Sequence, residues 1–236
     1  MIAITSISPN HINAGIQQKA IDSWVKLGME VYSINSKKEC EILEPIYTGV
    51  KFLQTVRTME KTYGRPHVNI SAIIDACKEM QGDEFCIINS DIELTESVSL
   101  ANVSKEILNN LVIANRINHN GDYKGNTYLA GFDVFFIHRR FLDLFPQSMH
   151  AMGMTFVDYF IPYTATQNGV QVVIIEQPFA YHLNHAAQYS KDMWLKSGRF
   201  FLWENMLYQF NDTKDVGKMS NFVYNYIYNS SVKKKI

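Results

Sequence analysis

The chain has 236 residues, of which 47% are hydrophobic and 19% charged, and its formal net charge is -1. This length suffices for one sizeable domain with a buried core, and this composition is typical of soluble globular proteins. A net charge so close to zero excludes a general electrostatic attraction to nucleic acid. No stretch approaches the roughly 18 apolar residues that a membrane-spanning helix needs, and the amino terminus lacks the pattern of a secretion signal. We therefore expect a cytoplasmic protein with no nucleic-acid partner and no transmembrane segment.

The three cysteines support the same location. Cys40, Cys77 and Cys86 are odd in number and lack the spacing of metal ligands. Cys77 and Cys86 fall on apolar faces of predicted elements, where a cysteine packs as a small hydrophobic residue. We interpret them as free thiols in a reducing compartment.

The first 35 residues predict a strand, a helix and a second strand. Residues 1–8 form a short apolar run that ends at Pro9, and residues 13–27 carry apolar side chains at helical spacing before Gly28. Residues 29–35 form the next apolar run. Strand, helix and strand with short connections indicate a right-handed parallel crossover. This is the first half of a nucleotide-binding α/β sheet.

Apolar runs and turn signals predict the remaining elements. The further strands are expected near residues 49–52 and at 85–88, 111–115, 128–137 (interrupted at Gly131) and 170–175. The further helices are expected within 37–48 and at 54–63, 70–80, 97–110, 139–144, 156–163 and 193–210, with one more before the end of the chain. Residues 118–126 are expected to form a polar loop, and Lys233 to Ile236 a frayed basic tail.

The triplet Asn89-Ser90-Asp91 directly follows the apolar run 85–88. In open α/β sheets, ligands bind at the carboxyl ends of such buried strands. Residues two apart project to the same side, so Asn89 and Asp91 can offer an oxygen and a carboxylate to one ion. Hard oxygen ligands suit Mg²⁺ or Mn²⁺, which also bind diphosphate oxygens. The alternative is that Asp91 only caps the following turn.

Two histidines follow a later strand at a spacing of three residues, His182 and His185. With this spacing, one imidazole can face the site while the other packs, and a neutral imidazole can complete a metal's coordination. We expect His182 to be the ligand, with His185 as the alternative. A satisfied histidine pair at a loop surface is the other interpretation.

Asp158 lies among aromatic residues at the start of a predicted helix. If it is buried there, its affinity for a proton is raised, as a general base requires. A solvent-facing Asp on an amphipathic helix fits the same pattern.

Arg65 and Asn69 flank the start of the helix that precedes the Asn89-Ser90-Asp91 strand. Helix N-termini attract phosphate, and an arginine beside one adds positive charge. Taken singly, they also fit a turn arginine and an N-cap. The lysines at 233–235 fit a solvated tail, or a weak contact with anionic membrane lipids.

The order of these features resembles the GT-A class of nucleotide-sugar glycosyltransferases, with Asn89-Ser90-Asp91 in the place of the DxD-type motif. The similar segments are 4–9, 64–69, 86–91, 130–135, 157–162 and 178–185, within residues 2–195. The resemblance implies a single α/β domain at residues 1–195, with a Rossmann-like, mostly parallel central sheet flanked by helices. Residues 196–236 would form a C-terminal helical extension.

The resemblance also implies roles for individual residues. Asp158 would be the catalytic base, and Asp91 with His182 would hold Mn²⁺ or Mg²⁺. The residues expected to bind the nucleotide-sugar donor are Ser6, Asn35, Arg65, Asn69, Asn89, Ser90, Asp91, Gly131 and Asp133. The expected reaction moves a sugar from a nucleoside-diphosphate sugar to a hydroxyl of a glycan-type acceptor, with inversion favoured because Asp158 is the one acid that matches the base position.

Asn89 departs from the motif, whose first position is usually Asp. One negative charge fewer would make metal affinity depend on the phosphates of the nucleotide, and it leaves open a catalytically inactive nucleotide-binding module. The second enzymatic alternative is a sugar nucleotidyltransferase. That class opens with a Gly-rich basic loop after the first strand, which residues 6–10 lack.

Overall fold

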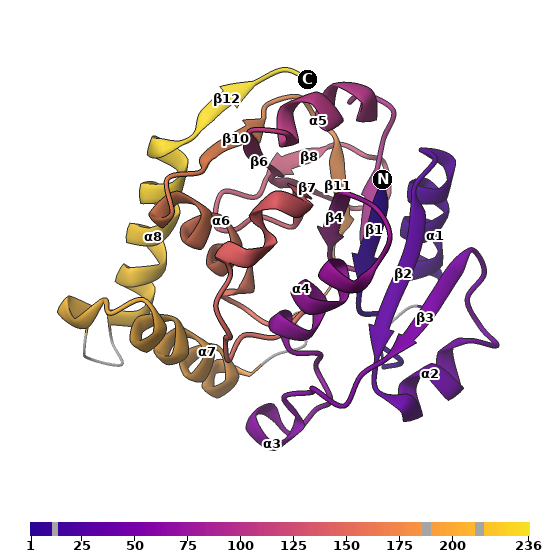
Figure 1. Cartoon of the computed structure of the whole chain (residues 1–236), viewed down its shortest axis with the longest axis horizontal. Helices are drawn as coiled ribbons and strands as arrows, with labels where there is room; N and C mark the ends of the chain where they lie inside the picture. Colours follow the sequence, from indigo (N-terminus) through magenta and orange to yellow (C-terminus); the bar gives the residue numbers. More distant parts are fainter. Residues whose placement is uncertain (11–13, 186–189, 211–214) are drawn as a thin grey trace.

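The computed structural model describes residues 1–10, 14–185, 190–210 and 215–236, and its centre is an eight-stranded sheet (Figure 1). The strands in their order across the sheet are β12 (Val232–Lys234), β10 (Gln171–Ile175), β6 (Asn110–Ala114), β9 (Val134–His138), β4 (Glu84–Ile88), β1 (Ile2–Thr5), β2 (Glu30–Asn35) and β3 (Val50–Gln54). Neighbouring strands are parallel except at β9, which runs antiparallel to both β4 and β6. The prediction of a mostly parallel sheet is confirmed.

Helices cover both faces of this sheet, and each face has its own core. The first core contains side chains from α4 (Ile70–Glu79), η1 (Arg139–Leu144), α6 (Val157–Gln167), α7 (Lys191–Glu204) and α8 (Val216–Ser230). The second contains side chains from α1 (Ala14–Lys26), α2 (Lys37–Leu43) and α5 (Leu100–Ile107). Within β4, Phe85 and Ile87 belong to the first core, and Cys86 and Ile88 to the second. Burial on both faces explains the unbroken apolar run at 85–88.

A second sheet of four strands lies at the edge of the first sheet where the strands β4 and β6 end. Its order is β5 (Ile92–Leu94), β11 (Ala180–Leu183), β7 (Arg116–His119) and β8 (Gly125–Thr127). β5 follows β4 and β7 follows β6 along the chain, so the second sheet begins where these two parallel strands end. The antiparallel β9 starts at this same edge, because Val134 lies opposite both Ile88 and Ala114. The polar residues after β4, after β6 and before β9 are therefore brought together.

Several boundaries differ from the predicted ones. The helix expected at 54–63 is wrong for most of its length: Gln54 ends β3, and only Glu60–Tyr63 (α3) is helical. The polar loop at 118–126 is shorter than expected, because β7 and β8 pair as a hairpin. The strand expected at 128–137 begins only at Val134. Asn115 explains this, since its Nδ2 donates to the carbonyls of Tyr128 and Gly131 and holds that segment out of the ladder. The long helix expected at 193–210 ends at Glu204, and a short 3-10 turn, η2 (Tyr208–Phe210), follows.

The C-terminal residues are part of the fold, so the prediction of a frayed tail is wrong. β12 pairs in parallel with β10, with Val232 beside Val173 (yellow in Figure 1). Lys233 donates to the carbonyls of Tyr228 and Ser231, and Lys234 forms an ion pair with Glu106. Two of the three lysines thus bond within the protein, which weakens the basis for the predicted contact with lipids. The predicted domain boundary after residue 195 falls inside α7.

Two further expectations concern the thiols and membrane spans. The three cysteines are free thiols, as predicted, and Cys40 is buried as well as Cys77 and Cys86. In the part of the chain that the structure describes, no helix is long and apolar enough to cross a membrane.

Candidate functional site

Three side chains from two segments converge at the edge where β4 ends. Asp91 lies in the turn between β4 and β5, and His182 lies on β11 directly opposite Ile92. Asp91 Oδ2 is 3.4 Å from His182 Nε2 and 3.2 Å from His185 Nε2, and the two Nε2 atoms are 3.1 Å apart. Both imidazoles face the carboxylate, so the expectation that only one would face the site while the other packs is wrong.

This triangle fits a metal ion. Ligands at right angles, each about 2.1–2.2 Å from one ion, lie about 3.0–3.1 Å apart, close to the observed spacings. A carboxylate with two imidazoles is a common set for first-row transition metals, whereas Mg²⁺ prefers oxygen ligands alone. Of the two ions expected from the sequence, the donor set favours Mn²⁺. Among the described residues, this is the one group of three such side chains close enough to share an ion.

A second cluster surrounds Asp133, immediately before β9. Its Oδ1 accepts hydrogen bonds from Asn89 Nδ2 at 2.9 Å and from Arg116 Nη1 at 2.8 Å. Arg116 Nε donates to Asn118, and the guanidinium lies over the ring of Tyr128 at 4.3 Å. Asp133 is only 4% exposed, and its Oδ2 is buried with no hydrogen-bond partner among the described residues. One carboxylate oxygen thus accepts two hydrogen bonds, while the other accepts none from the described residues.

Arg116 is the site residue that the sequence reasoning missed. Its charge acts on Asp91 and Asp158 as well as on Asp133, so one guanidinium lies among three acids. The signal that could have found it is the one that found Asp91. Arg116 stands just after the apolar run 111–114, where a parallel strand reaches the ligand-binding edge.

Asp158 lies in the first turn of α6, close enough to Asp133 to interact with its charge. The residue keeps some accessible surface, but its Oδ1 is buried and has no hydrogen-bond partner in the described part of the chain. The pKa of Asp158 is raised to about 8, mainly by burial and to a smaller extent by the negative charge of Asp133. Backbone N–H groups of Phe156 and Asp158 and the charge of Arg116 act in the opposite direction. The structure therefore favours the buried interpretation over a solvent-facing Asp.

Gly131 gives the Asp158 carboxylate its space. A Cβ atom at position 131 would lie 2.2 Å from Asp158 Oδ2 and 3.3 Å from the Tyr128 ring. Any larger residue at 131 would therefore displace the carboxylate. Gly131, predicted to border the donor sugar, lies against the predicted base.

Ser90 is held by the buried side chain of Gln17 on α1. With its amide oriented to satisfy all its neighbours, Gln17 accepts from Ser90 Oγ at 2.7 Å and forms two 3.0 Å bonds with the backbone of Ser8. This bridge joins the end of β1 to the Asn89-Ser90-Asp91 turn. It fixes the turn from the side of β1 and α1.

Two predicted donor-binding residues use their side-chain amides within the fold. Asn35 is fully buried, accepts from Ser33 Oγ and donates to the carbonyl of Ile7. Asn69 caps α4 as predicted, with its Oδ1 accepting from the backbone of Ser71 and its Nδ2 donating to the carbonyl of Ser148. Neither amide is available to a ligand in this conformation, so neither residue belongs to the proposed donor site.

Ser6 and Arg65 are two further residues that the sequence predicts to bind the donor. Ser6 is partly exposed just after β1, and its Oγ lies 3.5 Å from Asn35 Nδ2. Arg65 is exposed in the turn after α3. Its charge lowers the pKa of His67, although burial lowers that pKa more. Both remain predictions as donor-binding residues.

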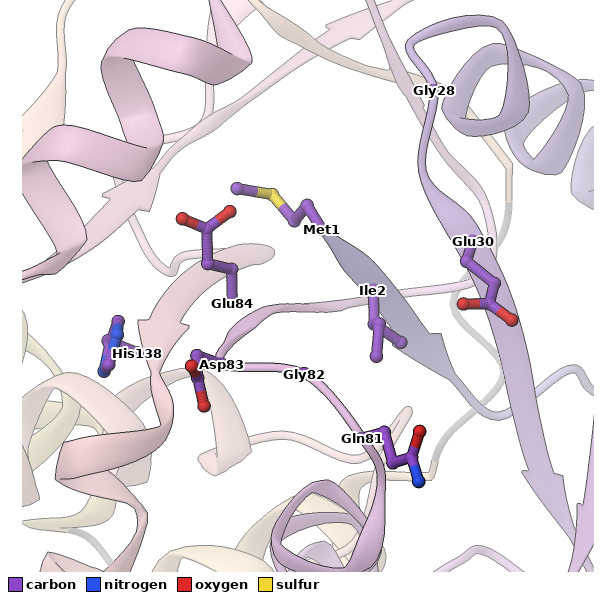
Figure 2. A pocket seen from close by; sticks show the side chains of 9 residues that line it. All are labelled: Met1, Ile2, Gly28, Glu30, Gln81, Gly82, Asp83, Glu84 and His138. Carbon is purple, nitrogen blue, oxygen red and sulfur yellow. The ribbon is translucent and has the colours of Figure 1, made fainter.

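A hollow lies at the opposite edge of the sheet, where β1, β2 and β4 begin (Figure 2). Its volume is about 590 Å³, and its lining includes the carboxylates of Glu30, Asp83 and Glu84. Lys51 pairs with Glu30 and Arg139 with Asp83. This edge carries the amino-terminal ends of the parallel strands, where α/β sheets do not bind their ligands. We therefore place the functional site at Asp91 and not in this hollow.

Comparison with known proteins places the fold. No protein-family model and no curated protein matches the sequence. The structure of S. aureus TarS 1–349 in complex with UDP matches with a TM-score of 0.50 and 15% identity over 86% of this chain and 64% of that one. Its complex with UDP-GlcNAc gives 0.49 and 14% over 85% and 65%, and the inositol-1-phosphate CTP transferase from T. maritima gives 0.48 and 13% over 84% and 94%.

The chain thus spans less than two thirds of the TarS structures. At such low identities the comparison shows the fold alone. The chain is an α/β protein with a GT-A-like fold, as the resemblance in the sequence implied.

Proposed function

We propose that the chain is a metal-dependent glycosyltransferase that moves a sugar from a nucleoside-diphosphate sugar to a hydroxyl of a glycan-type acceptor. The observation that carries the proposal is the convergence of Asp91, His182 and His185 at the ligand-binding edge of a GT-A-like sheet. Asp158, whose pKa is raised, interacts electrostatically with Asp133 and Arg116, which form an ion pair at the same edge.

Donor binding would use the edge of the sheet. Asp91 and the two histidines would hold Mn²⁺, which supplies positive charge to the diphosphate when bound. Ser90, fixed by Gln17, lies in the same turn as Asp91. Ser6 and Arg65 are proposed to contact the nucleotide, and Gly131 and Asp133 the sugar. TarS has been crystallised with UDP and UDP-GlcNAc, which makes UDP-sugars the first donors to test.

Asp158 would act as the general base. Its carboxylate accepts the proton of the acceptor hydroxyl while the hydroxyl oxygen forms a bond to the anomeric carbon of the donor sugar. The bond between that carbon and the diphosphate oxygen breaks, and the nucleoside diphosphate leaves with the electron pair. Attack from the side opposite the leaving group inverts the anomeric centre. Base catalysis of this kind typically contributes about 10²–10⁴-fold to the rate.

The site geometry suits this division of labour. Asp158 is poised by burial, because a pKa of about 8 gives a carboxylate enough basicity to share a proton with a hydroxyl. Asp91 is kept beside two imidazoles and is 18% exposed, so that a metal and its diphosphate can reach it. The glycan acceptor and a cytoplasmic location remain proposals from the sequence.

The test is a thermal-shift screen of UDP-, GDP-, ADP- and dTDP-linked sugars, with Mn²⁺ and with a chelator, followed by product analysis with glycan acceptors. The proposal predicts stabilisation by one class of nucleotide sugar that requires the metal, and net transfer of its sugar. Binding without transfer would favour a nucleotide-binding module. Release of inorganic pyrophosphate when a nucleoside triphosphate and a sugar phosphate are supplied would identify a nucleotidyltransferase. No binding of any nucleotide would contradict the proposal.

A further inference from the structure

Asn89 occupies the position where the DxD-type motif has Asp, and its hydrogen bond explains the difference. Asn89 Nδ2 donates to Asp133 Oδ1 at 2.9 Å. An ionised carboxylate has only acceptors, so an Asp at position 89 could not make this bond. It would instead place a second negative charge about 3 Å from the first, which is strongly unfavourable for buried groups.

The same contact fixes the orientation of Asp133. Arg116 approaches the same oxygen, Oδ1, at 2.8 Å, and Arg116 is itself held by Asn118 and by the ring of Tyr128. The Asp133 side chain is 5% exposed and that of Arg116 is 21% exposed, so this ion pair is largely shielded from water. A charge-assisted bond and an amide bond to one oxygen lock the carboxylate in a single orientation.

The other oxygen of Asp133 has nothing to accept from in the described part of the chain. Asp133 Oδ2 is buried without a partner, and an unsatisfied buried acceptor typically costs about 1–3 kcal/mol. The charge of Asp133 raises the pKa of Asp158, and Arg116 interacts electrostatically with both Asp133 and Asp91. A hydroxyl donor on a ligand that reaches Asp133 Oδ2 would satisfy this oxygen.

We infer that Asn89 is a positioning residue for Asp133 and not a weakened metal ligand. Asn89 and Arg116 hold Asp133 so that Oδ2 accepts a hydrogen bond from a hydroxyl of the donor's sugar. The unit Asn89–Asp133–Arg116 thereby selects donors that carry a free hydroxyl at that point of the ring. This inference rests on the proposed function, because it assigns the sugar part of the donor to this unit and the diphosphate to the metal triangle.

Asn89→Asp is the decisive variant, because the two roles predict opposite results. If Asn89 is a weakened metal ligand, an added carboxylate strengthens binding of Mn²⁺ and of the nucleotide sugar. If it positions Asp133, the variant binds the nucleotide sugar about tenfold or more weakly, because the sugar loses its partner. Its affinity for the corresponding nucleoside diphosphate with Mn²⁺ stays within about threefold of the native value, because that part of the donor does not contact Asp133.

The measurement is calorimetric titration with the tightest-binding nucleotide sugar of the screened panel and with its nucleoside diphosphate, both with Mn²⁺. Asp133→Asn, which keeps the volume of the side chain, should show the same selective loss and carries the test if Asn89→Asp fails to fold. Asn120→Asp is the matched control. It adds the same charge to an exposed loop and keeps the oxygen that accepts from Asn184, so both affinities should remain native.

The outcomes separate the inference from the proposed function. If the native chain binds no nucleotide sugar, the proposed function fails and the inference fails with it. If the native chain binds one and the variants bind it as tightly or more tightly, only the inference is overturned. An equal loss of nucleotide sugar and nucleoside diphosphate would also overturn it, because that pattern marks a general disturbance of the turn.

Discussion

The two edges of the central sheet both carry carboxylates but treat them differently. At the edge where the parallel strands begin, the side chains of Glu30 and Asp83 are 46% and 66% exposed and pair with Lys51 and Arg139. At the edge where β4 ends, the side chains of Asp91 and Asp133 are 18% and 5% exposed. The difference lies in burial more than in charge, since acids are present at both edges.

Burial changes what a carboxylate can do. Lys51 and Tyr32 lower the pKa of Glu30, which stays an ordinary surface anion. Burial instead raises the pKa of Asp158 to about 8, which makes it a stronger base than an exposed acid. Exposed ion pairs typically contribute about 0–1 kcal/mol, whereas shielded groups interact strongly with one another. Changes at the two edges should therefore have very different effects on function.

The largest effect is expected from Asp91→Ala. It removes the one carboxylate of the triangle, so metal-dependent binding of a nucleoside diphosphate should be abolished. The loss should exceed the roughly 10–100-fold that removal of an outer partner of a metal ligand costs. Calorimetry of the nucleoside diphosphate with and without Mn²⁺ measures it. Nucleotide affinity equal to the native value would show that Asp91 does not hold the metal.

Asp158→Asn should be next, with transfer reduced by about 10²–10⁴-fold and donor binding retained. The amide keeps the shape of the side chain but cannot take the proton of the acceptor. Single-turnover transfer and donor titration on the same preparation separate the two quantities. Transfer at the native rate would rule out Asp158 as the base.

Gly131→Ala tests whether the position of Asp158 matters as well as its chemistry. The new Cβ would lie 2.2 Å from Asp158 Oδ2, so the carboxylate must move. A displacement of about 1 Å can lower the rate by about 10²-fold, and kcat should fall more than donor affinity. Unchanged kcat in the folded variant would show that the base does not depend on this contact. The control for this variant is Ala130→Gly, at the neighbouring exposed position. Gly121→Ala is not a suitable control, because Gly121 has a positive φ of 111° and a side chain there would strain the backbone.

The pH dependence should follow the raised pKa of Asp158. The base acts when ionised, so kcat/KM should rise about tenfold per pH unit below pH 8 and level off above it.

The stability of the fold should change with pH in the opposite direction. Since the folded pKa of about 8 exceeds the ordinary value of 3.8, the folded state binds the proton more tightly, and the contribution of Asp158 to stability declines from about pH 4 to pH 8. Asp158→Asn should flatten both profiles, and unchanged profiles in that variant would assign them to another group.

The smallest effect is expected at the opposite edge. Asp83→Asn breaks an exposed ion pair with Arg139, and the free energy of unfolding should change by less than about 1 kcal/mol. Nucleotide affinity and transfer should remain native, as measured by denaturant unfolding and the same titrations. A marked loss of nucleotide binding in Asp83→Asn would mean that the hollow in Figure 2 takes part in function.

The sequence predicted the elements with strong periodicity and the ends of the buried strands. The run 85–88 and the helix after Asn69 were readable because each is packed by a continuous or regularly spaced apolar face. The basic tail was misread because its pairing with β10 comes from a strand about 60 residues away, which no local pattern encodes. The helix expected at 54–63 failed for a similar reason, since Gln54 pairs with β2 and Thr58 forms a bridge with Val68.

The candidate site was predictable where a polar residue follows an apolar strand, as at Asp91. The shared role of the histidines was not, because it depends on β11 lying beside β5 and on the strand ending at Leu183, before His185. Asn35 and Asn69 show the opposite limit. Their types suited a ligand, but the neighbouring backbone had already taken their hydrogen bonds.

The most direct test of the account is a Mn²⁺ titration of the native chain followed by electron paramagnetic resonance, alongside the His182→Ala and His185→Ala variants. The account predicts that the native chain removes free Mn²⁺ from the spectrum in the presence of a nucleoside diphosphate, and that each variant weakens this binding. Undiminished Mn²⁺ binding in both histidine variants, or none in the native chain with the nucleotide present, would contradict a metal centre at Asp91, His182 and His185.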